Sequence, residues 1–205
     1  MRRRSMFRRS LAVLALALAT LLVPATAHAD TSHTGMGDEV LRIRPTKSAG
    51  LLTLKHTGES NFIVTTLNSS GKQEELLVNT IGPYKGTVLY NGDGTSKSIV
   101  ALQIKADGAW SAVFKPLSKA RCWCAASLQG SGDQVLKLSP TRGLRTVTAA
   151  HTGEANVIVQ SYTRPGSWGD LLFNEIGAYR GKTLLPVGTR LVSVKAAGSW
   201  TLKRH

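Results

Sequence analysis

The chain has 205 residues, of which 42% are apolar and 19% are charged, and it contains two cysteines. This length accommodates one large or two small domains. The composition excludes wholesale disorder and collagen-like repeats. Lys and Arg number 26 against 12 Asp and Glu, and a charge balance of this sign favours anionic partners.

Residues 1–29 have the three parts of a secretory signal peptide. Five arginines lie within the first nine residues, an apolar run extends from Leu11 to Val23, and Ala27-His28-Ala29 forms a small-x-small cleavage motif. The apolar run is shorter than the roughly 20 residues that a membrane-spanning helix needs. We therefore expect cleavage before Asp30, a mature chain without a membrane span, and a secreted, extracellular location that includes association with the cell surface.

Two copies of one unit follow the leader. Residues 37–86 align with residues 132–181 at a constant offset of 95, with 22 identities in 50 positions. Beyond a five-residue deletion the offset becomes 90, and Lys105-Ala106-x-Gly108-x-Trp110 recurs at residues 195–200. The duplication predicts four parts after the signal peptide. These are an N-terminal extension (30–36), a first repeat (37–117), a linker with Cys122 and Cys124 (118–131) and a second repeat (132–205).

Each repeat is predicted to consist of strands. Apolar residues alternate with others along 100–106 and 192–196, which is typical of half-buried strands. Residues 61–67 and 156–162 are rich in β-formers, and turn signals separate these segments. Seven or so short strands per repeat predict an all-β fold of two β-sandwiches with jelly-roll-like connections. Trp110 and Trp200 are expected in the cores.

A polar motif recurs at the end of one strand in each repeat. His56, Glu59 and Asn61 in the first copy correspond to His151, Glu154 and Asn156 in the second. One interpretation is a pair of equivalent ligand-binding pockets. The alternative is structural, with a Thr-Gly turn, Glu and Asn bonding loop amides, and a buried imidazole at the end of the sheet.

A second repeated motif, Leu-Leu-x-Asn-x-Ile-Gly-x-Tyr-x-Gly, contains Tyr84 and Tyr179. These tyrosines are either platforms on which sugars stack or buried residues that hydrogen-bond to a loop. Gly82 and Gly86 are expected to adopt positive φ.

Cys122 and Cys124 flank Trp123 in the predicted linker. On an extended strand, Cα atoms two residues apart lie at the limit of disulfide range. The residues therefore leave three outcomes open: a local disulfide, bridges to another chain, or a thiolate metal site. A local or intermolecular disulfide is favoured because no histidine is nearby in the sequence.

Motifs for catalysis are absent from the sequence. It has no Gly-x-Ser-x-Gly elbow, no His-Glu-x-x-His and no phosphate-binding glycine loop. The Asn91-Gly92-Asp93-Gly94 segment lacks the bidentate carboxylate of a calcium loop. We therefore expect no catalytic residue, no cofactor and no metal.

Together the repeated motifs resemble a repeat of functionally uncharacterised secreted actinobacterial proteins. The signature is His-Thr-Gly-Glu-x-Asn, Leu-Leu-x-Asn-x-Ile-Gly-x-Tyr-x-Gly and Ala-x-Gly-x-Trp, over most of residues 37–115 and 132–202. The resemblance implies export and tandem β-sandwiches, and it transfers no catalytic residue. The Cys122-Trp123-Cys124 segment departs from the pattern.

The expected function is a secreted, non-enzymatic binding module. Without residues 1–29 the chain keeps 21 basic and 12 acidic residues, a net charge of +9. This charge favours an anionic cell-wall polymer or glycan, and a protein is the other partner considered. No sequence-specific nucleic-acid partner is expected because no recognition motif is present. The alternatives are an assembly subunit joined through sheet edges or Cys122 and Cys124, and a hydrolase that uses the repeated His and Glu.

Overall fold

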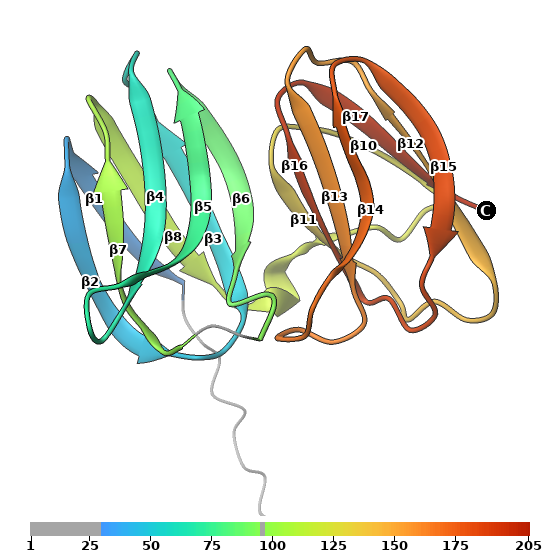
Figure 1. Cartoon of the computed structure of the whole chain (residues 1–205), viewed down its shortest axis with the longest axis horizontal. Coiled ribbons are helices and arrows are strands. Elements are labelled where there is room, and N and C mark those ends of the chain that lie inside the picture. The colour runs from blue at the N-terminus through green and yellow to red at the C-terminus, as the bar shows by residue number, and fades with distance from the viewer. Residues whose placement is uncertain (1–29, 95–96) are drawn as a thin grey trace, which may run out of the picture.

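The computed structural model describes residues 30–94 and 97–205, so the predicted signal peptide lies outside the described residues. Apart from one 3₁₀ turn at Leu117–Lys119, every regular element of the described residues is a β-strand. The prediction of an all-β sandwich fold is confirmed (Figure 1). None of the described helical segments has the length and apolar character needed to cross a membrane.

The first eight strands form two facing sheets. Their bounds are β1 Thr31–Met36, β2 Glu39–Thr46, β3 Gly50–His56, β4 Asn61–Asn68, β5 Gln73–Ile81, β6 Tyr84–Tyr90, β7 Ile99–Lys105 and β8 Ala109–Lys115. One sheet has the order β1-β8-β3-β6 and the other β2-β7-β4-β5. Eight strands in two sheets with these connections form a jelly roll. We call this unit sandwich 1.

The remaining strands repeat the arrangement as sandwich 2. Their bounds are β9 Arg121–Cys122, β10 Ser127–Ser131, β11 Gln134–Lys137, β12 Arg145–His151, β13 Asn156–Tyr162, β14 Asp170–Ile176, β15 Tyr179–Leu185, β16 Leu191–Ala196 and β17 Ser199–Arg204. The sheets have the orders β10-β17-β12-β15 and β14-β13-β16-β11-β9. With β9 set aside, this is the strand order of sandwich 1.

Each sandwich has its own apolar core, supplied by the inward residues of its strands. In β7 the buried Leu102 and Ile104 alternate with less buried neighbours, as the sequence pattern predicts. Trp110 and Trp200 are each 3% exposed and belong to the cores of sandwich 1 and sandwich 2 respectively.

The same corner closes both sandwiches. Asp38 Oδ1 accepts a hydrogen bond from the Ala106 N–H at 2.9 Å, and Trp110 Nε1 donates to the Gly37 carbonyl at 3.0 Å. The Trp110 indole lies over Gly35, where a Cβ would come within 2.2 Å of the ring. In sandwich 2 the equivalent bonds join Asp133 to Ala196 and Trp200 to Gly132. These contacts tie the first and last strands of each unit together.

The segments expected as extension and linker contain strands. Residues 30–36 include β1, which pairs with β8, and residues 118–131 include β9 and β10. Sandwich 1 therefore has eight strands, and sandwich 2 has the equivalent eight together with the short strand β9. All three strands are at sheet edges. β1 and β10 are rich in Ser, Thr and Gly, and β9 has only two residues, so none of them shows the apolar alternation that identifies a half-buried strand.

The two sandwiches contact each other through an edge of the first and a sheet of the second. Tyr84 Oη donates to Asp133 Oδ2 at 2.7 Å, and the Thr87 N–H donates to the Asp133 carbonyl at 2.9 Å. A small apolar cluster lies beside these bonds. Its buried members are Leu51, Ala120, Val135, Tyr162 and Leu191, with Leu89 and Leu117 partly buried.

Replacing Asp133 therefore tests the corner and the contact at once. We expect Asp133→Ala to lower the free energy of unfolding by about 2–3 kcal/mol, because the Ala196 N–H and the Tyr84 hydroxyl lose a buried acceptor. The equivalent Asp38→Ala, which removes only the bond to Ala106, should cost about 1 kcal/mol. Chemical denaturation checks both values, and equal losses would contradict the role assigned to Tyr84.

The pH dependence of this site follows from the burial of Asp133. Burial raises the pKa of Asp133 above its ordinary 3.8, against hydrogen bonds from Tyr84 and Ala196 and the charge of Lys195, which lower it. A carboxyl group with a raised pKa contributes most stability below pH 3.8, and this contribution is lost as pH rises through the raised pKa. As pH rises from 3.8 through the raised pKa of Asp133, the free energy of unfolding of D133N should therefore increase relative to that of wild type. Denaturation at a series of pH values provides the measurement.

Candidate functional site

His56, the last residue of β3, is a buried brace between loops. Its side chain is 2% exposed, and Nδ1 lies 3.0 Å from the Gly82 carbonyl oxygen. Nε2 lies 3.2 Å from Asp107 Oδ1, an ion-pair distance without the geometry of a hydrogen bond. The ring stacks on Phe62 with centroids 4.5 Å apart. These contacts hold two turns against the end of the strand.

His151 has the same place at the end of β12 and is 3% exposed. Its Nδ1 lies 2.8 Å from the Gly177 carbonyl oxygen, equivalent to that of Gly82. Its Nε2 lies 2.9 Å from the Ala197 carbonyl oxygen. Ala197 occupies the position of Asp107, so a backbone oxygen here replaces the carboxylate. The bracing function persists although the partner has changed.

The acidic and amide residues of the motif do not join the histidines in a pocket. The side chains of Glu59, Asn61, Glu154 and Asn156 are exposed. The loop amides are bound by Asp107, whose Oδ2 accepts hydrogen bonds from the Glu59 and Ser60 N–H groups, both at 2.9 Å. Desolvation raises the pKa of Asp107, but these bonds and His56 outweigh it and lower the value overall. Sequence reasoning missed Asp107 because it lies 48 residues from Glu59.

Tyr84 and Tyr179 occupy equivalent positions but have different surroundings. Both rings lie over the glycine two residues on, Gly86 or Gly181, where a Cβ would collide with the phenol. Gly86 is therefore needed because it leaves room for the Tyr84 ring. The expected positive φ is found at Gly82 and not at Gly86. Burial and the adjacent Asp133 raise the pKa of Tyr84. Tyr84 belongs to the contact between the sandwiches, whereas Tyr179 lies on the edge strand β15.

The bracing interpretation predicts a loss of stability when either histidine is removed. His56→Ala and His151→Ala should each lower the free energy of unfolding by about 2–4 kcal/mol, because a buried ring is lost and carbonyls lose their partners. Glu154→Ala, at an exposed side chain, is the control and should change it by less than about 0.5 kcal/mol. Denaturation curves check this, and unchanged stability in the histidine variants would contradict the assignment.

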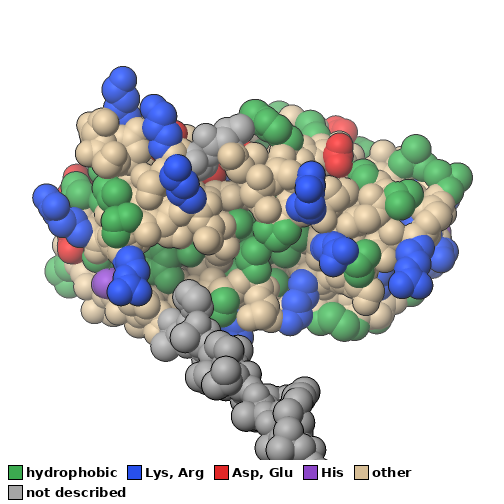
Figure 2. Space-filling model, turned by 90° about the horizontal axis from the view of Figure 1, so that it is seen from below, with side chains coloured by type: hydrophobic (Ala, Val, Ile, Leu, Met, Phe, Trp, Pro, Cys, Tyr) green, Lys and Arg blue, Asp and Glu red, His purple; other side chains and the backbone are tan. Residues whose placement is uncertain are grey.

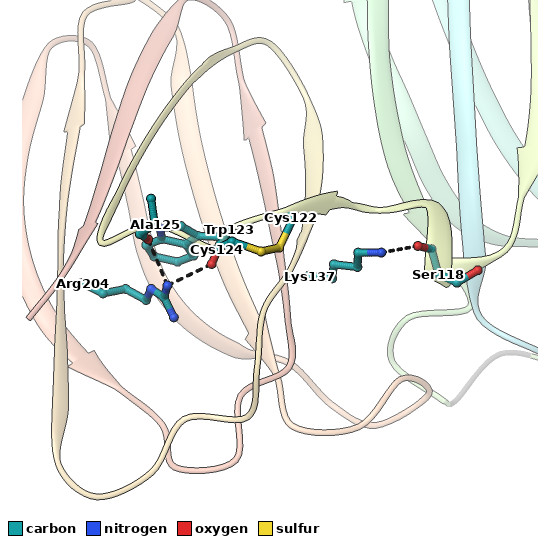
Figure 3. Close-up of a disulfide and its surroundings, with 7 residues drawn as sticks. All are labelled: Ser118, Cys122, Trp123, Cys124, Ala125, Lys137 and Arg204. Carbon is teal, nitrogen blue, oxygen red and sulfur yellow. Dashed lines mark hydrogen bonds between the residues drawn. A yellow bond between two sulfur atoms is a disulfide. The ribbon is translucent and has the colours of Figure 1, made fainter.

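Cys122 and Cys124 form a local disulfide with Cα atoms 5.3 Å apart (Figure 3). Trp123 between them is fully buried in the core of sandwich 2, although both cysteines are exposed. Arg204 Nη2 donates to the carbonyls of Trp123 and Ala125, each at 2.9 Å, and its guanidinium carbon lies 5.0 Å from the centre of the Trp123 ring. The disulfide segment therefore anchors the connection between the sandwiches.

The indole should contribute more to this anchor than the disulfide. A disulfide between residues two apart closes a very short loop, so chain entropy assigns it less than about 2 kcal/mol. Trp123→Ala should cost about 3–5 kcal/mol because it empties a buried site. We expect the double variant Cys122→Ser/Cys124→Ser to unfold close to wild type and Trp123→Ala well below it in thermal denaturation. The reverse order would overturn this ranking.

A basic groove lies where the sandwiches meet. Its volume is about 690 Å³, and it is lined by residues of sandwich 1, the connection and sandwich 2. The charged side chains that line it are Lys85, Lys115, Lys119, Arg121 and Asp133. Asp133 is occupied by Tyr84 and Ala196. Arg121 donates to Gln134 Oε1 and the Gln129 carbonyl.

The three lysines of the groove make no ion pair with any described residue. Because a hollow lined by one sign of charge concentrates counter-ions, the groove is suited to an anionic ligand. Figure 2 shows one face of the molecule on which Lys and Arg side chains are spread over both sandwiches and acidic side chains are few. The sequence alone does not reveal this cluster, because only the fold brings Lys85 beside Lys115, Lys119 and Arg121.

A second depression of about 310 Å³ has the opposite character. It is lined by Glu74, Glu75 and Asp93 together with Lys195 and the exposed Trp168. It shares Thr87, Gln134 and Val135 with the basic groove, so the two depressions flank the same contact. Among the described residues no three His, Cys, Asp or Glu side chains are placed to hold a metal ion.

Comparisons with known proteins supply no family. No family model matches the chain, and no curated protein matches it. One similar solved structure is the regulatory domain of Toxoplasma gondii PKA with cAMP, at 8% identity and a TM-score of 0.25, with 86% of this chain and 77% of that chain covered. Another is the stem and receptor-binding domain of spike protein P1 from bacteriophage PM2, at 8% identity and a TM-score of 0.18, with 88% and 79% covered. Similarity this weak supports no inference about function.

Proposed function

We propose that the protein is a secreted, non-enzymatic binding module that holds an anionic cell-wall polymer or glycan in the basic groove. The observation that carries the proposal is the convergence of Lys85, Lys115, Lys119 and Arg121 on one hollow whose single carboxylate is already hydrogen-bonded. The net charge of +9 after residue 29 adds long-range attraction.

The shape of the groove favours a chain-like ligand. It is a depression open to solvent rather than an enclosed cavity, and its cations come from β6, β8, the 3₁₀ turn and β9. Repeated phosphate or carboxylate groups along one polymer can each meet one of these cations. Separate weak contacts on one chain then add up, because each later contact is intramolecular.

The hydrolase alternative finds no support in the repeated motif. His56 Nε2 faces Asp107, His151 Nε2 faces a backbone carbonyl, and both rings are buried. The side chains of Glu59 and Glu154 are exposed, whereas the two imidazoles are buried. The proposed binding site therefore consists of Lys85, Lys115, Lys119 and Arg121, which have no identical counterparts in the other repeat.

Charge reversal in the groove tests the proposal. In the chain from Asp30, which keeps every described strand, Lys85→Glu/Lys119→Glu should weaken binding to poly(glycerol phosphate) about tenfold to a hundredfold at low salt. Equilibrium binding to the labelled polymer provides the measurement, and high salt should weaken wild-type binding strongly.

The control is Lys72→Glu/Lys203→Glu, which makes the same change in net charge at exposed sites outside the groove. It should lose no more than about threefold, since distant surface charges act weakly. An equal loss in both double variants would show attraction to net charge alone. No binding of the wild-type chain at low salt would remove the polymer proposal.

A further inference from the structure

The contact between the sandwiches has two different halves. One half is the edge strand β6, which presents Tyr84, the Thr87 N–H and Leu89. The other half is the outer face of the sheet that contains β11 and β16, which presents Asp133 and Val135. An edge therefore packs on a face, and the contact is not symmetric.

Because the sandwiches are repeats, sandwich 2 has its own copy of the edge. Tyr179 and Leu184 on β15 are identical to Tyr84 and Leu89 on β6. The registers agree, since His56 pairs with Tyr84 as His151 pairs with Tyr179. Like β6, β15 is the last strand of its sheet. No described residue of the chain packs on this second edge as sandwich 2 packs on β6.

Sandwich 1 likewise has its own copy of the face. Asp38, Val40 and Lys105 are identical to Asp133, Val135 and Lys195, which form or border the contact. Val40 pairs with Gln103 of β7 in the same register in which Val135 pairs with Ser193 of β16. The Asp38 Oδ1 bond to Ala106 matches that of Asp133 to Ala196.

The apolar side chains of the internal contact are buried, whereas their counterparts on the second edge and the second face are exposed. Val135 is 2% exposed in the contact, whereas its counterpart Val40 is 55% exposed. Leu184 is 57% exposed, whereas Leu89 is partly buried against the inter-sandwich cluster. Apolar side chains at such positions on strand edges and faces favour association.

We propose that a second copy of this chain occupies these surfaces, with the β15 edge of one molecule packed on the β2–β7 face of the next. By analogy with the internal contact, Tyr179 Oη donates to Asp38 of the neighbour, and the Lys182 N–H donates to its carbonyl. Val40 packs against Leu184. Gly86 lets Asp133 approach closely in the internal contact, because a Cβ at this position would come within 3.0 Å of Asp133 Cβ. Its counterpart Gly181 leaves the same space for Asp38 of the neighbour.

The association is head to tail, since it joins two different surfaces and leaves one of each free at the ends. It is weaker than the internal contact, because Leu117 and Ala120 of the connection support only the internal one. It is also opposed by the repulsion of two chains of net charge +9 after residue 29. High salt therefore strengthens this association, whereas it weakens polymer binding in the groove.

Sedimentation velocity of residues 30–205, over a wide concentration range at low and high salt, tests the proposal. Wild type should form species larger than a monomer as concentration rises, more so at high salt. Val40→Lys and Leu184→Lys should each weaken the association at least about tenfold. Leu144→Lys, at a leucine that is 82% exposed and belongs to none of β2, β7 and β15, is the matched control and should associate like wild type.

Mixing the two variants distinguishes this geometry from a symmetric dimer. The V40K chain keeps an intact edge and the L184K chain keeps an intact face, so an equimolar mixture should form heterodimers and stop there. Monomeric wild type at every concentration, or a mixture as monomeric as its parts, would overturn the proposal. Survival of the association in both single variants would overturn it equally, and none of these results bears on the groove lysines.

Discussion

The arrangement of the molecule depends on one carboxylate shared between two units. Asp133 holds the corner of its own sandwich through the Ala196 N–H, while its other oxygen accepts the hydroxyl of Tyr84 from the neighbouring sandwich. Its carbonyl takes the Thr87 N–H as well. Asp133 accepts hydrogen bonds from donors in both sandwiches. The placement of sandwich 2 against sandwich 1 is therefore coupled to the corner contact that closes sandwich 2. The basic groove exists only where that coupling holds the sandwiches together.

Much of the fold was predictable because its signals are local. Alternating apolar residues near Val100–Ala106 identify β7, and the two core tryptophans follow from their spacing. The edge strands β1, β9 and β10 were missed because an edge strand needs little apolar sequence to pair with a neighbour. The local disulfide was one of several open outcomes, and the chain path at Cys122 and Cys124 selects it.

The candidate site was predictable only in part. The repeated histidines are at strand ends, as expected, but the contacts that explain them come from Gly82, Asp107 and Ala197, remote in sequence. The groove cations come from strands and a connection that only the topology brings together. The identical histidines and tryptophans of the two repeats are buried and hold each sandwich together, whereas the cations of the groove come from the connection and from positions at which the repeats differ.

The pairing of the first strand with the eighth has a consequence for how the chain folds. Thr31 pairs with Phe114, so the sheet that begins sandwich 1 stays incomplete until the last strand of that unit is available. Contacts of such long sequence separation form slowly. In a nascent chain β1 therefore stays without its partner strand until β8 has been synthesised, so nearly the whole of the first unit must be made before this sheet can close.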